Sequence, residues 1–336
     1  MTTLYLTEPG TVIHCKNQVL DIVQQEHHQT YRLADVSLMV VMPGVQLTSV
    51  TLSRLFDSNV ETIFLDKNGQ FRGRLQGQYA TNPMVRIAQY QVLDSTFGMA
   101  IAQRMVDGKV RNQRVLLQRR NRQMKPKRAE LRQAIARMGD SLASLQPRET
   151  PHSRDTLMGI EGNCAQLYYQ ALRYCFSEEW KFTGRNRRPP RDPINALLSW
   201  GYSILLSRSF VACVQAGLDP YVGYFHAVQP YRPNLVLDVM EEFRPVVVDQ
   251  AVISLVQSEV LTPDDFEPSP EGDGIWLGTL AKKLFLTKLE QQFNSTLLYP
   301  SQNRRLSLTQ IMFEQARLLG RCLVDRQLDY EPFVIR

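Results

Sequence analysis

The chain has 336 residues, and its 39 lysines and arginines outnumber its 33 aspartates and glutamates to give a formal net charge of +6. Hydrophobic residues make up 43% of the chain and charged residues 21%. This is the composition of an ordinary globular protein, and it excludes a disordered tail protein, a fibre and a membrane protein. The length predicts two domains, because a domain usually has about 100–200 residues.

The first part of the chain predicts a small β-rich domain. Short apolar runs alternate there with turn signals such as Pro9-Gly10 and Pro43-Gly44. Strands are predicted at residues 3–6, 11–14, 18–23, 32–41, 62–65 and 71–75, with one short amphipathic helix at residues 50–57. We assign this domain to residues 1–78.

The remainder of the chain predicts helices. From Met84 onward, apolar residues recur at helical spacing, as in Val85, Ala88 and Val92. We place a linker at 79–84 and an all-helical domain at 85–336, so the expected fold class is α+β. The acidic segment 262–274 is rich in Pro, Gly and Asp, which predicts an exposed loop, and we assign it no role.

The cysteines and the N-terminus favour a reducing cytoplasm. The five cysteines are scattered and form no CxxC pair, which argues against a disulfide framework and against a structural zinc site. The N-terminal residues show no charged segment followed by an apolar run, so they do not predict a signal peptide. No stretch of about 18 apolar residues stands out, and we expect no membrane-spanning helix.

The positive charge is concentrated in two segments. The sequence pI is about 9.1, which favours an anionic partner such as nucleic acid. Residues 104–132 are strongly basic, and the Pro-Pro segment 184–191 carries a second cluster of arginines. An arginine fork suits phosphate, although either cluster could instead be a solvated face. The predicted DNA contacts in these segments are Arg119, Arg120, Arg122, Arg185, Arg187, Arg188 and Arg191.

Four side chains in three segments are candidates for metal chemistry. Glu161 is flanked by Gly159 and Gly162, which would leave room for a bulky ligand, although it could simply be an acid that stabilises a helix start. His226 follows an aromatic run and could equally be a structural histidine.

The third segment contributes two carboxylates. Asp238 and Glu241 are three residues apart, so they should project from one helix face and repel unless a cation lies between them. Arg244 could instead neutralise Glu241 as a surface ion pair. Taken together, Glu161, His226, Asp238 and Glu241 suit Mg²⁺ or Mn²⁺, and such a site beside arginine clusters predicts phosphodiester chemistry.

The chain resembles a known family, the CRISPR-associated spacer-acquisition integrases. The resemblance rests on Gly159-Ile160-Glu161-Gly162, on Gly217-Leu218-Asp219-Pro220 with His226, and on the order and spacing of further segments. Those further segments are 64–75, 192–202, 237–245 and 330–333. Together they cover nearly the whole chain, which makes the pattern more specific than any single motif.

The resemblance implies a metal held by Glu161, His226 and Glu241, the last being Asp in some members of the family. It implies that Asp238 is a further acid near the metal and that Arg244 is a basic position close to the site. We expect Arg244 to contact a DNA phosphate there, as a further predicted DNA contact. It also implies a homodimer formed through the β-domains, a small CRISPR-associated partner protein, and double-stranded DNA as substrate. The reaction would be attack of a 3′-hydroxyl on a phosphodiester at the end of a CRISPR repeat, and His226 could alternatively relay a proton.

Two other functions are compatible with these residues. One is an architectural DNA-binding protein that has the basic surface but no catalytic metal. The other is a helical phosphodiesterase that acts on small nucleotides. Strand transfer in the presence of Mn²⁺, and competition between branched DNA and a cyclic dinucleotide, would distinguish them from an integrase.

Overall fold

The computed structural model divides the chain into two compact units, Met1–Thr81 and Asn82–Arg336. The division falls inside the segment predicted as a linker, of which residues 79–81 lie outside the described part of the chain. The structure describes residues 2–58, 60–67, 69, 71–75, 77, 82–146, 150–186, 189–269, 272 and 274–335.

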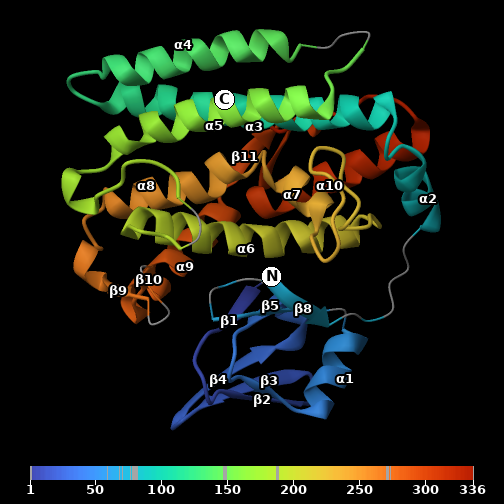
Figure 1. Ribbon diagram of the computed structural model, residues 1–336. Helices are drawn as coiled ribbons and strands as arrows, with labels where there is room; N and C mark the ends of the chain where they lie inside the picture. The colour runs from blue at the N-terminus through green and yellow to red at the C-terminus, as the bar shows by residue number, and fades with distance from the viewer. Residues whose placement is uncertain are drawn as a thin grey trace. The chain divides into compact units, whose positions relative to one another are not determined.

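The N-terminal unit is β-rich, as predicted, and its described residues form two four-stranded sheets (Figure 1). The first sheet has the order β1 (Thr2–Leu6), β5 (Val36–Val41), β7 (Glu61–Leu65) and β8 (Phe71–Leu75). The second has the order β4 (His27–Arg32), β3 (Val19–Gln24), β2 (Val12–Lys16) and β6 (Gln46–Leu47). The strands β1, β5 and β7 run parallel, and β8 joins β7 in an antiparallel hairpin.

One helix and an apolar core complete this unit. The helix α1 (Ser49–Asp57) begins at Thr48, whose side chain accepts a hydrogen bond from the backbone N–H of Thr51 at 3.2 Å. Alternate residues of the strands, among them Ile13, Leu20 and Met39, are fully buried in the core. The strands β4 and β6 were not predicted, because β4 is almost entirely exposed and carries no apolar alternation.

The C-terminal unit is mostly helical, whereas the sequence predicted an all-helical domain. Within its described residues, two short hairpins interrupt the helices: β9 (Phe266–Pro268) with β10 (Ile275–Leu277), and β11 (Thr296–Tyr299) with β12 (Arg304–Ser307). The helices are α2 (Pro83–Gln91), α3 (Thr96–Gln123), α4 (Ala129–Ser144), α5 (Arg154–Leu172), α6 (Pro193–Gln215), α7 (Asn234–Met240), α8 (Gln250–Val256), α9 (Thr279–Asn294) and α10 (Leu308–Asp325). A π-helical turn, η4 (Arg244–Asp249), connects α7 to α8.

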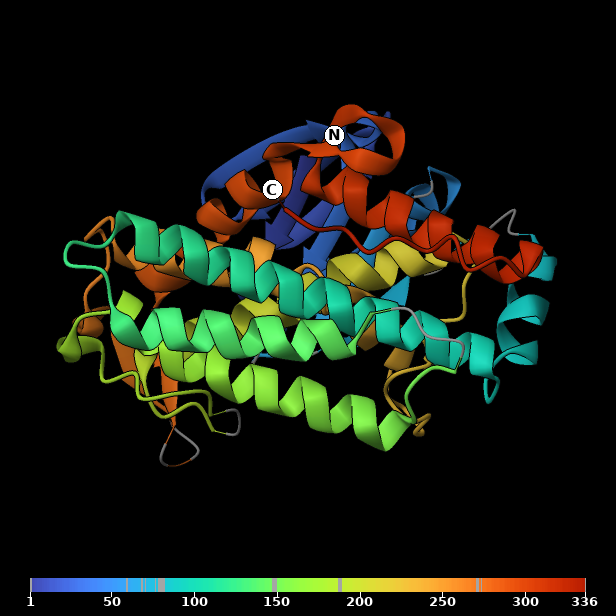
Figure 2. The ribbon, with the colours of Figure 1, turned by 90° about the horizontal axis from the view of Figure 1, so that it is seen from above.

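The long helices α3, α4 and α5 pack against one another and form one layer of this unit (Figures 1 and 2). Beneath them lies α6, a long apolar helix (Figure 1). Asp192 caps its N-terminus, where the carboxylate accepts the N–H of Asn195 at 2.8 Å. By length and composition α6 could cross a membrane, which corrects the expectation that no such stretch exists. However, 78% of its most apolar window is buried inside the unit, as in a central core helix.

The acidic segment 262–274 is not simply an exposed loop. Its residues Phe266 and Glu267 belong to β9, and the ring of Phe266 packs edge-to-face against Trp180 with the centroids 6.0 Å apart. Residues 270, 271 and 273 lie outside the described part of the chain. Burial of the Phe266 ring therefore anchors part of a segment whose composition predicted an exposed loop.

Candidate active site

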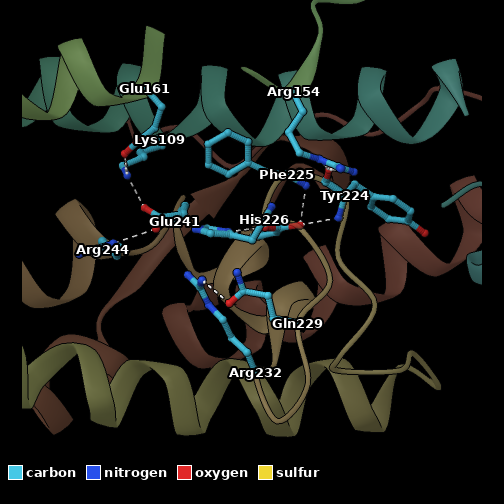
Figure 3. A network of polar contacts seen from close by, with 11 residues as sticks. Lys109, Arg154, Glu161, Tyr224, Phe225, His226, Gln229, Arg232, Glu241 and Arg244 are labelled. Atoms are coloured by element: carbon cyan, nitrogen blue, oxygen red, sulfur yellow. Dashed lines mark hydrogen bonds and ion pairs between the residues drawn. The ribbon is translucent and has the colours of Figure 1, made fainter. Parts of the chain in front are cut away.

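A buried lysine joins two of the predicted site residues. The ammonium group of Lys109, in the middle of α3, contacts Oε1 of Glu161 from α5 and lies 2.5 Å from Oε2 of Glu241, which follows α7 (Figure 3). Only 5% of the Lys109 side chain and 7% of the Glu241 side chain are exposed, while Glu161 keeps 20%. Two carboxylates far apart in the sequence thus converge on one cation.

Glu161 lies well inside α5, because this helix begins at Arg154. The alternative of a helix-start acid is therefore wrong, since the stabilising field of a helix terminus fades within the first turn. A Cβ placed on Gly159 or on Gly162 would meet nothing within 4 Å. The two glycines therefore have open space beside them on the surface of α5.

Glu241 has a second cation beside it. Arg244 Nη1 donates to Oε1 of Glu241 at 2.8 Å, and the guanidinium lies over the ring of Tyr202, 4.0 Å from its centroid. This ion pair was anticipated as a surface pair, but it is buried, with 13% and 7% of the two side chains exposed. Burial alone would raise the pKa of Glu241, and the charges of Arg244 and Lys109 outweigh it and hold that pKa well below its usual value.

Further polar contacts hold the far side of Arg244. The hydroxyl of Tyr202 donates to Asp249, and the hydroxyl of Tyr168 donates to the other oxygen of the same carboxylate at 2.6 Å. Arg185 also lies over the ring of Tyr202, 5.5 Å from its centroid. This buried network fixes the arginine that faces Glu241.

Asp238 and Glu241 do not project together, which corrects the expectation from their spacing. Asp238 is fully buried and lies under the loop before α7, where its Oδ2 accepts the backbone N–H groups of Tyr224 and Phe225 at 2.7 and 2.9 Å. Its Oδ1 accepts the backbone N–H of His226 at 3.0 Å and lies 2.6 Å from Nδ1 of the same residue. Asp238 therefore positions His226 and does not face the two glutamates.

His226 lies next to Glu241 (Figure 3), and its Nδ1 lies 2.6 Å from Oδ1 of Asp238. Its positive charge, when present, is one of the causes that lower the pKa of Glu241. With the hydrogen on Nδ1 bound to Asp238, the lone pair of Nε2 is available to a ligand. Glu161, Glu241 and His226 thus meet in one region, and Asp238 supports it from behind.

The donor set suits a divalent metal, although the carboxylates are now held by a lysine. Among the described residues, no three His, Cys, Asp or Glu side chains are placed to hold an ion by themselves. Instead the ammonium of Lys109 lies between the two glutamates, and Oε2 of Glu241 has this ionic contact but no hydrogen bond. Two carboxylates that share a cation beside an imidazole are the hard ligands that Mg²⁺ or Mn²⁺ requires.

The sequence reasoning did not single out Lys109, which it grouped with the basic stretch 104–132. A signal was present, since Ala102, Met105 and Leu116 are buried and Lys109 follows the same helical spacing on α3. A lysine on the apolar side of a helix requires a buried anionic partner.

Several arginines predicted to contact DNA serve the fold. Arg120 is only 9% exposed and its guanidinium donates to Gln257 at 3.1 Å, so it is not part of an exposed surface. Arg185 is anchored by Asn195 at 2.7 Å and Ser199 at 3.1 Å. Arg122 and Arg191 are exposed and Arg119 is half-buried, whereas Arg187 and Arg188 lie outside the described part of the chain.

The comparison with known families decides the identity. The model of the family described as "CRISPR associated protein Cas1" matches residues 4–291. This chain belongs to the Cas1 family. A curated relative from Moorella thermoacetica, named CRISPR-associated endonuclease Cas1 1, is 33% identical over 343 residues, which cover 100% of this chain and 99% of the relative.

Solved structures share the Cas1 fold over almost the whole chain. A casposase bound to an integration product matches 98% of this chain and 93% of its own with a TM-score of 0.83 at 24% identity. A chain of a Cas6-RT-Cas1–Cas2 complex matches 98% of this chain and 36% of its own, with a TM-score of 0.80 at 25% identity. The resemblance stated from the sequence is thereby confirmed, and so is the order of a β-rich unit before a mostly helical one.

Proposed function

We propose that this Cas1-family protein is a divalent-metal-dependent DNA endonuclease and integrase that inserts short foreign DNA into a CRISPR array. The observation that supports this most strongly is the convergence of Glu161 and Glu241 on one cation, with His226 beside them. Its relatives are named endonucleases, and a chain of similar fold is a casposase bound to an integration product.

Glu161, His226 and Glu241 would hold Mg²⁺ or Mn²⁺. When bound, the ion would polarise the phosphoryl oxygen and stabilise the charge that develops in the transition state. Asp238 holds the His226 ring in one orientation through Nδ1, so the direction of Nε2 is fixed before a ligand binds. Arg244 stays with Glu241, where its charge favours the ionised carboxylate that a metal ligand must be.

DNA would approach the exposed side of Glu161. Gly159 and Gly162 are exposed and leave open space on the surface of α5, where a duplex backbone could come close to the helix that carries Glu161. A 3′-hydroxyl would then attack a phosphodiester at the end of a repeat, so that a new P–O bond forms while the bond to the repeat strand's own 3′ oxygen breaks and that oxygen leaves as a free 3′-hydroxyl. Water in place of the attacking hydroxyl would give nuclease activity. Contacts from exposed arginines such as Arg122 and Arg191 to phosphates would make the binding strongly salt-dependent and weakly sequence-specific.

The assembly we propose is a homodimer joined to a small Cas2-type partner. Support comes from the Cas1–Cas2 complex of similar fold, because a shared fold over nearly the whole chain presents comparable surfaces. Light scattering of the isolated chain should give the mass of a dimer. A monomer at micromolar concentration would contradict this part of the proposal.

The test is strand transfer with Mn²⁺, a labelled duplex with free 3′ ends and a plasmid that carries a repeat. Glu161→Gln keeps the shape of the side chain but removes its charge, and we expect a loss of at least about 100-fold in rate. The control is Asp155→Asn, which changes an exposed acid on the same helix and should keep wild-type activity.

Equal activity of wild type and Glu161→Gln would refute the assignment of the site. DNA binding without any metal-dependent strand transfer would favour an architectural protein. Competition in which a cyclic dinucleotide displaces branched DNA would instead favour a phosphodiesterase that acts on small nucleotides.

A further inference from the structure

Lys109 occupies the position between the two glutamates that would hold the metal. Its ammonium contacts both Glu161 and Glu241, and the other oxygen of Glu241 is paired with Arg244. Burial disfavours the charged form of Lys109, but the two carboxylates outweigh this effect and raise its pKa. The lysine is therefore a fixed positive charge inside the site.

The charges of the four side chains joined by these ion pairs balance before any ion enters, and Asp238, behind His226, adds one further negative charge. Glu161 and Glu241 carry two negative charges, and Lys109 and Arg244 carry two positive charges. A divalent ion placed among them would add two positive charges within a buried region, where repulsion is weakly screened. Entry of the ion thus requires that a cation leave or that an anion arrive.

Of the two cations, Lys109 is the one that can leave. Arg244 is held by Glu241 and by the ring of Tyr202, whose hydroxyl is itself bound to Asp249. Lys109 is held only by the two carboxylates in question, and its stem is long and flexible. The side chain of Glu161 keeps 20% of its surface exposed, so a displaced ammonium group can reach solvent past this carboxylate.

We propose that Lys109 is a resident cation that holds Glu161 and Glu241 together until the metal binds, and that the metal then displaces its ammonium toward the open side of Glu161. There the ammonium would meet a phosphate of the incoming DNA. This inference rests on the proposed function, because the displacing ion is the one held by Glu161, His226 and Glu241. It makes metal and DNA binding mutually reinforcing, since each relieves the charge imbalance that the other creates.

The first test measures Mn²⁺ binding in the absence of DNA by the electron paramagnetic resonance signal of the free ion. Lys109→Met removes the competing charge and keeps the length of the stem, and we expect it to bind Mn²⁺ at least 10-fold more tightly than the wild type. Arg137→Met is the matched control, because Arg137 is an exposed basic residue of α4, and its affinity should not change.

The second test uses the wild-type protein, so it does not depend on whether the variant folds. An acetylating reagent is applied with and without saturating Mn²⁺, and the labelled peptides are read by mass spectrometry. Lys109 should be protected without the ion, because its side chain is only 5% exposed, and should be labelled at least 5-fold faster with it. The exposed Lys283 of α9 should be labelled equally in both conditions.

Either of two results would overturn the inference while the proposed function stands: Lys109 stays protected when Mn²⁺ is bound, or Lys109→Met binds Mn²⁺ no more tightly than the wild type. Absence of Mn²⁺ binding to the wild type at millimolar concentration, with or without DNA, would instead refute the proposed function. Tighter binding by the variant together with faster labelling of Lys109 would support displacement of the lysine.

Discussion

The carboxylate of Asp238 fixes His226 through both its backbone and its ring, since Oδ1 lies 3.0 Å from the backbone nitrogen and 2.6 Å from Nδ1. The other oxygen accepts the N–H groups of Tyr224 and Phe225. One buried carboxylate therefore shapes the loop and aims the imidazole at the same time. Its effect on the metal acts through His226.

Asp238→Asn should weaken Mn²⁺ binding by about 10–100-fold, the usual effect of losing an outer partner of a ligating histidine. The amide NH₂ would face either a backbone N–H or the ring, so at least one hydrogen bond is lost. Asp219→Asn is the matched control, because Asp219 caps an exposed turn of the same loop through the N–H of Tyr221. Calorimetric titration with Mn²⁺ measures both, and equal affinities would contradict the positioning role.

Gly223→Ala should destabilise the protein by about 1–3 kcal/mol, the usual cost of forcing an extra carbon into a packed region. A Cβ at this position would lie 2.6 Å from Oδ2 of Asp238 and 2.7 Å from the backbone carbonyl carbon of Asn234. Urea unfolding would show the loss. Gly159→Ala is the control, since that Cβ meets open space and a helical alanine is favoured over glycine by about 1 kcal/mol.

Glu242 should make the stability depend on pH. Burial raises its pKa from 4.5 to about 7, although Tyr330, Phe333 and Gln315 donate hydrogen bonds to it. Between these two values the folded protein keeps a proton that the unfolded chain has lost, so the free energy of unfolding falls as the pH rises, by up to about 1.4 kcal/mol per pH unit.

The control for this prediction is Glu242→Gln, which has no charge to bury. Urea unfolding of chelator-treated protein at pH 5.5 and 8 should show a larger decline for the wild type than for the variant. Identical pH dependence of the two proteins would show that Glu242 stays ionised. Because Glu242 holds the C-terminal segment through Tyr330 and Phe333, the protection of its amide hydrogens, measured against an unstructured peptide at the same pH, should be lower at the higher pH.

Gly162→Trp should block DNA without harming the fold. A Cβ at Gly162 would meet nothing within 4 Å, so a larger side chain can begin there without a clash, and an indole ring would cover part of the exposed surface of α5. We expect Mn²⁺ binding and the melting temperature to stay near those of the wild type, while DNA affinity falls at least about 10-fold because the phosphate backbone is kept away. Unchanged DNA affinity in a filter-binding assay would mean that DNA approaches from another side.

Arg120 and Arg122 should behave differently although they are neighbours in the sequence. Arg120→Met should lower the free energy of unfolding by about 1–3 kcal/mol, because it removes the hydrogen bonds that the buried guanidinium donates to Gln123 and Gln257. Arg122→Met should leave stability unchanged. It should make the slope of log DNA affinity against log salt concentration shallower by about the amount that one phosphate contact contributes. Denaturant unfolding and salt titrations separate the two effects, and a reversed pattern would contradict the burial of Arg120.

Much of the fold and of the site followed from the sequence. Apolar alternation and turn residues predicted most strands of the first unit, and helical spacing from Val85 onward predicted the character of the second. The strand His27–Arg32 escaped because its side chains face solvent, so no alternation marks it. Glu161, His226 and Glu241 were chosen because their residue types and local motifs suit a hard metal ion. Residue types and local motifs can be seen in the sequence without knowing which helices pack together.

Only the tertiary structure decided what lies between these side chains. Lys109 belongs to a stretch whose composition is basic throughout. Its contacts with Glu161, 52 residues away on α5, and with Glu241, which follows α7, exist only once the helices pack. The same packing buried Arg120 and turned Asp238 away from Glu241 toward the loop of His226. A sequence sets the charge and period of each helix, but the partner of each buried charge depends on which faces meet.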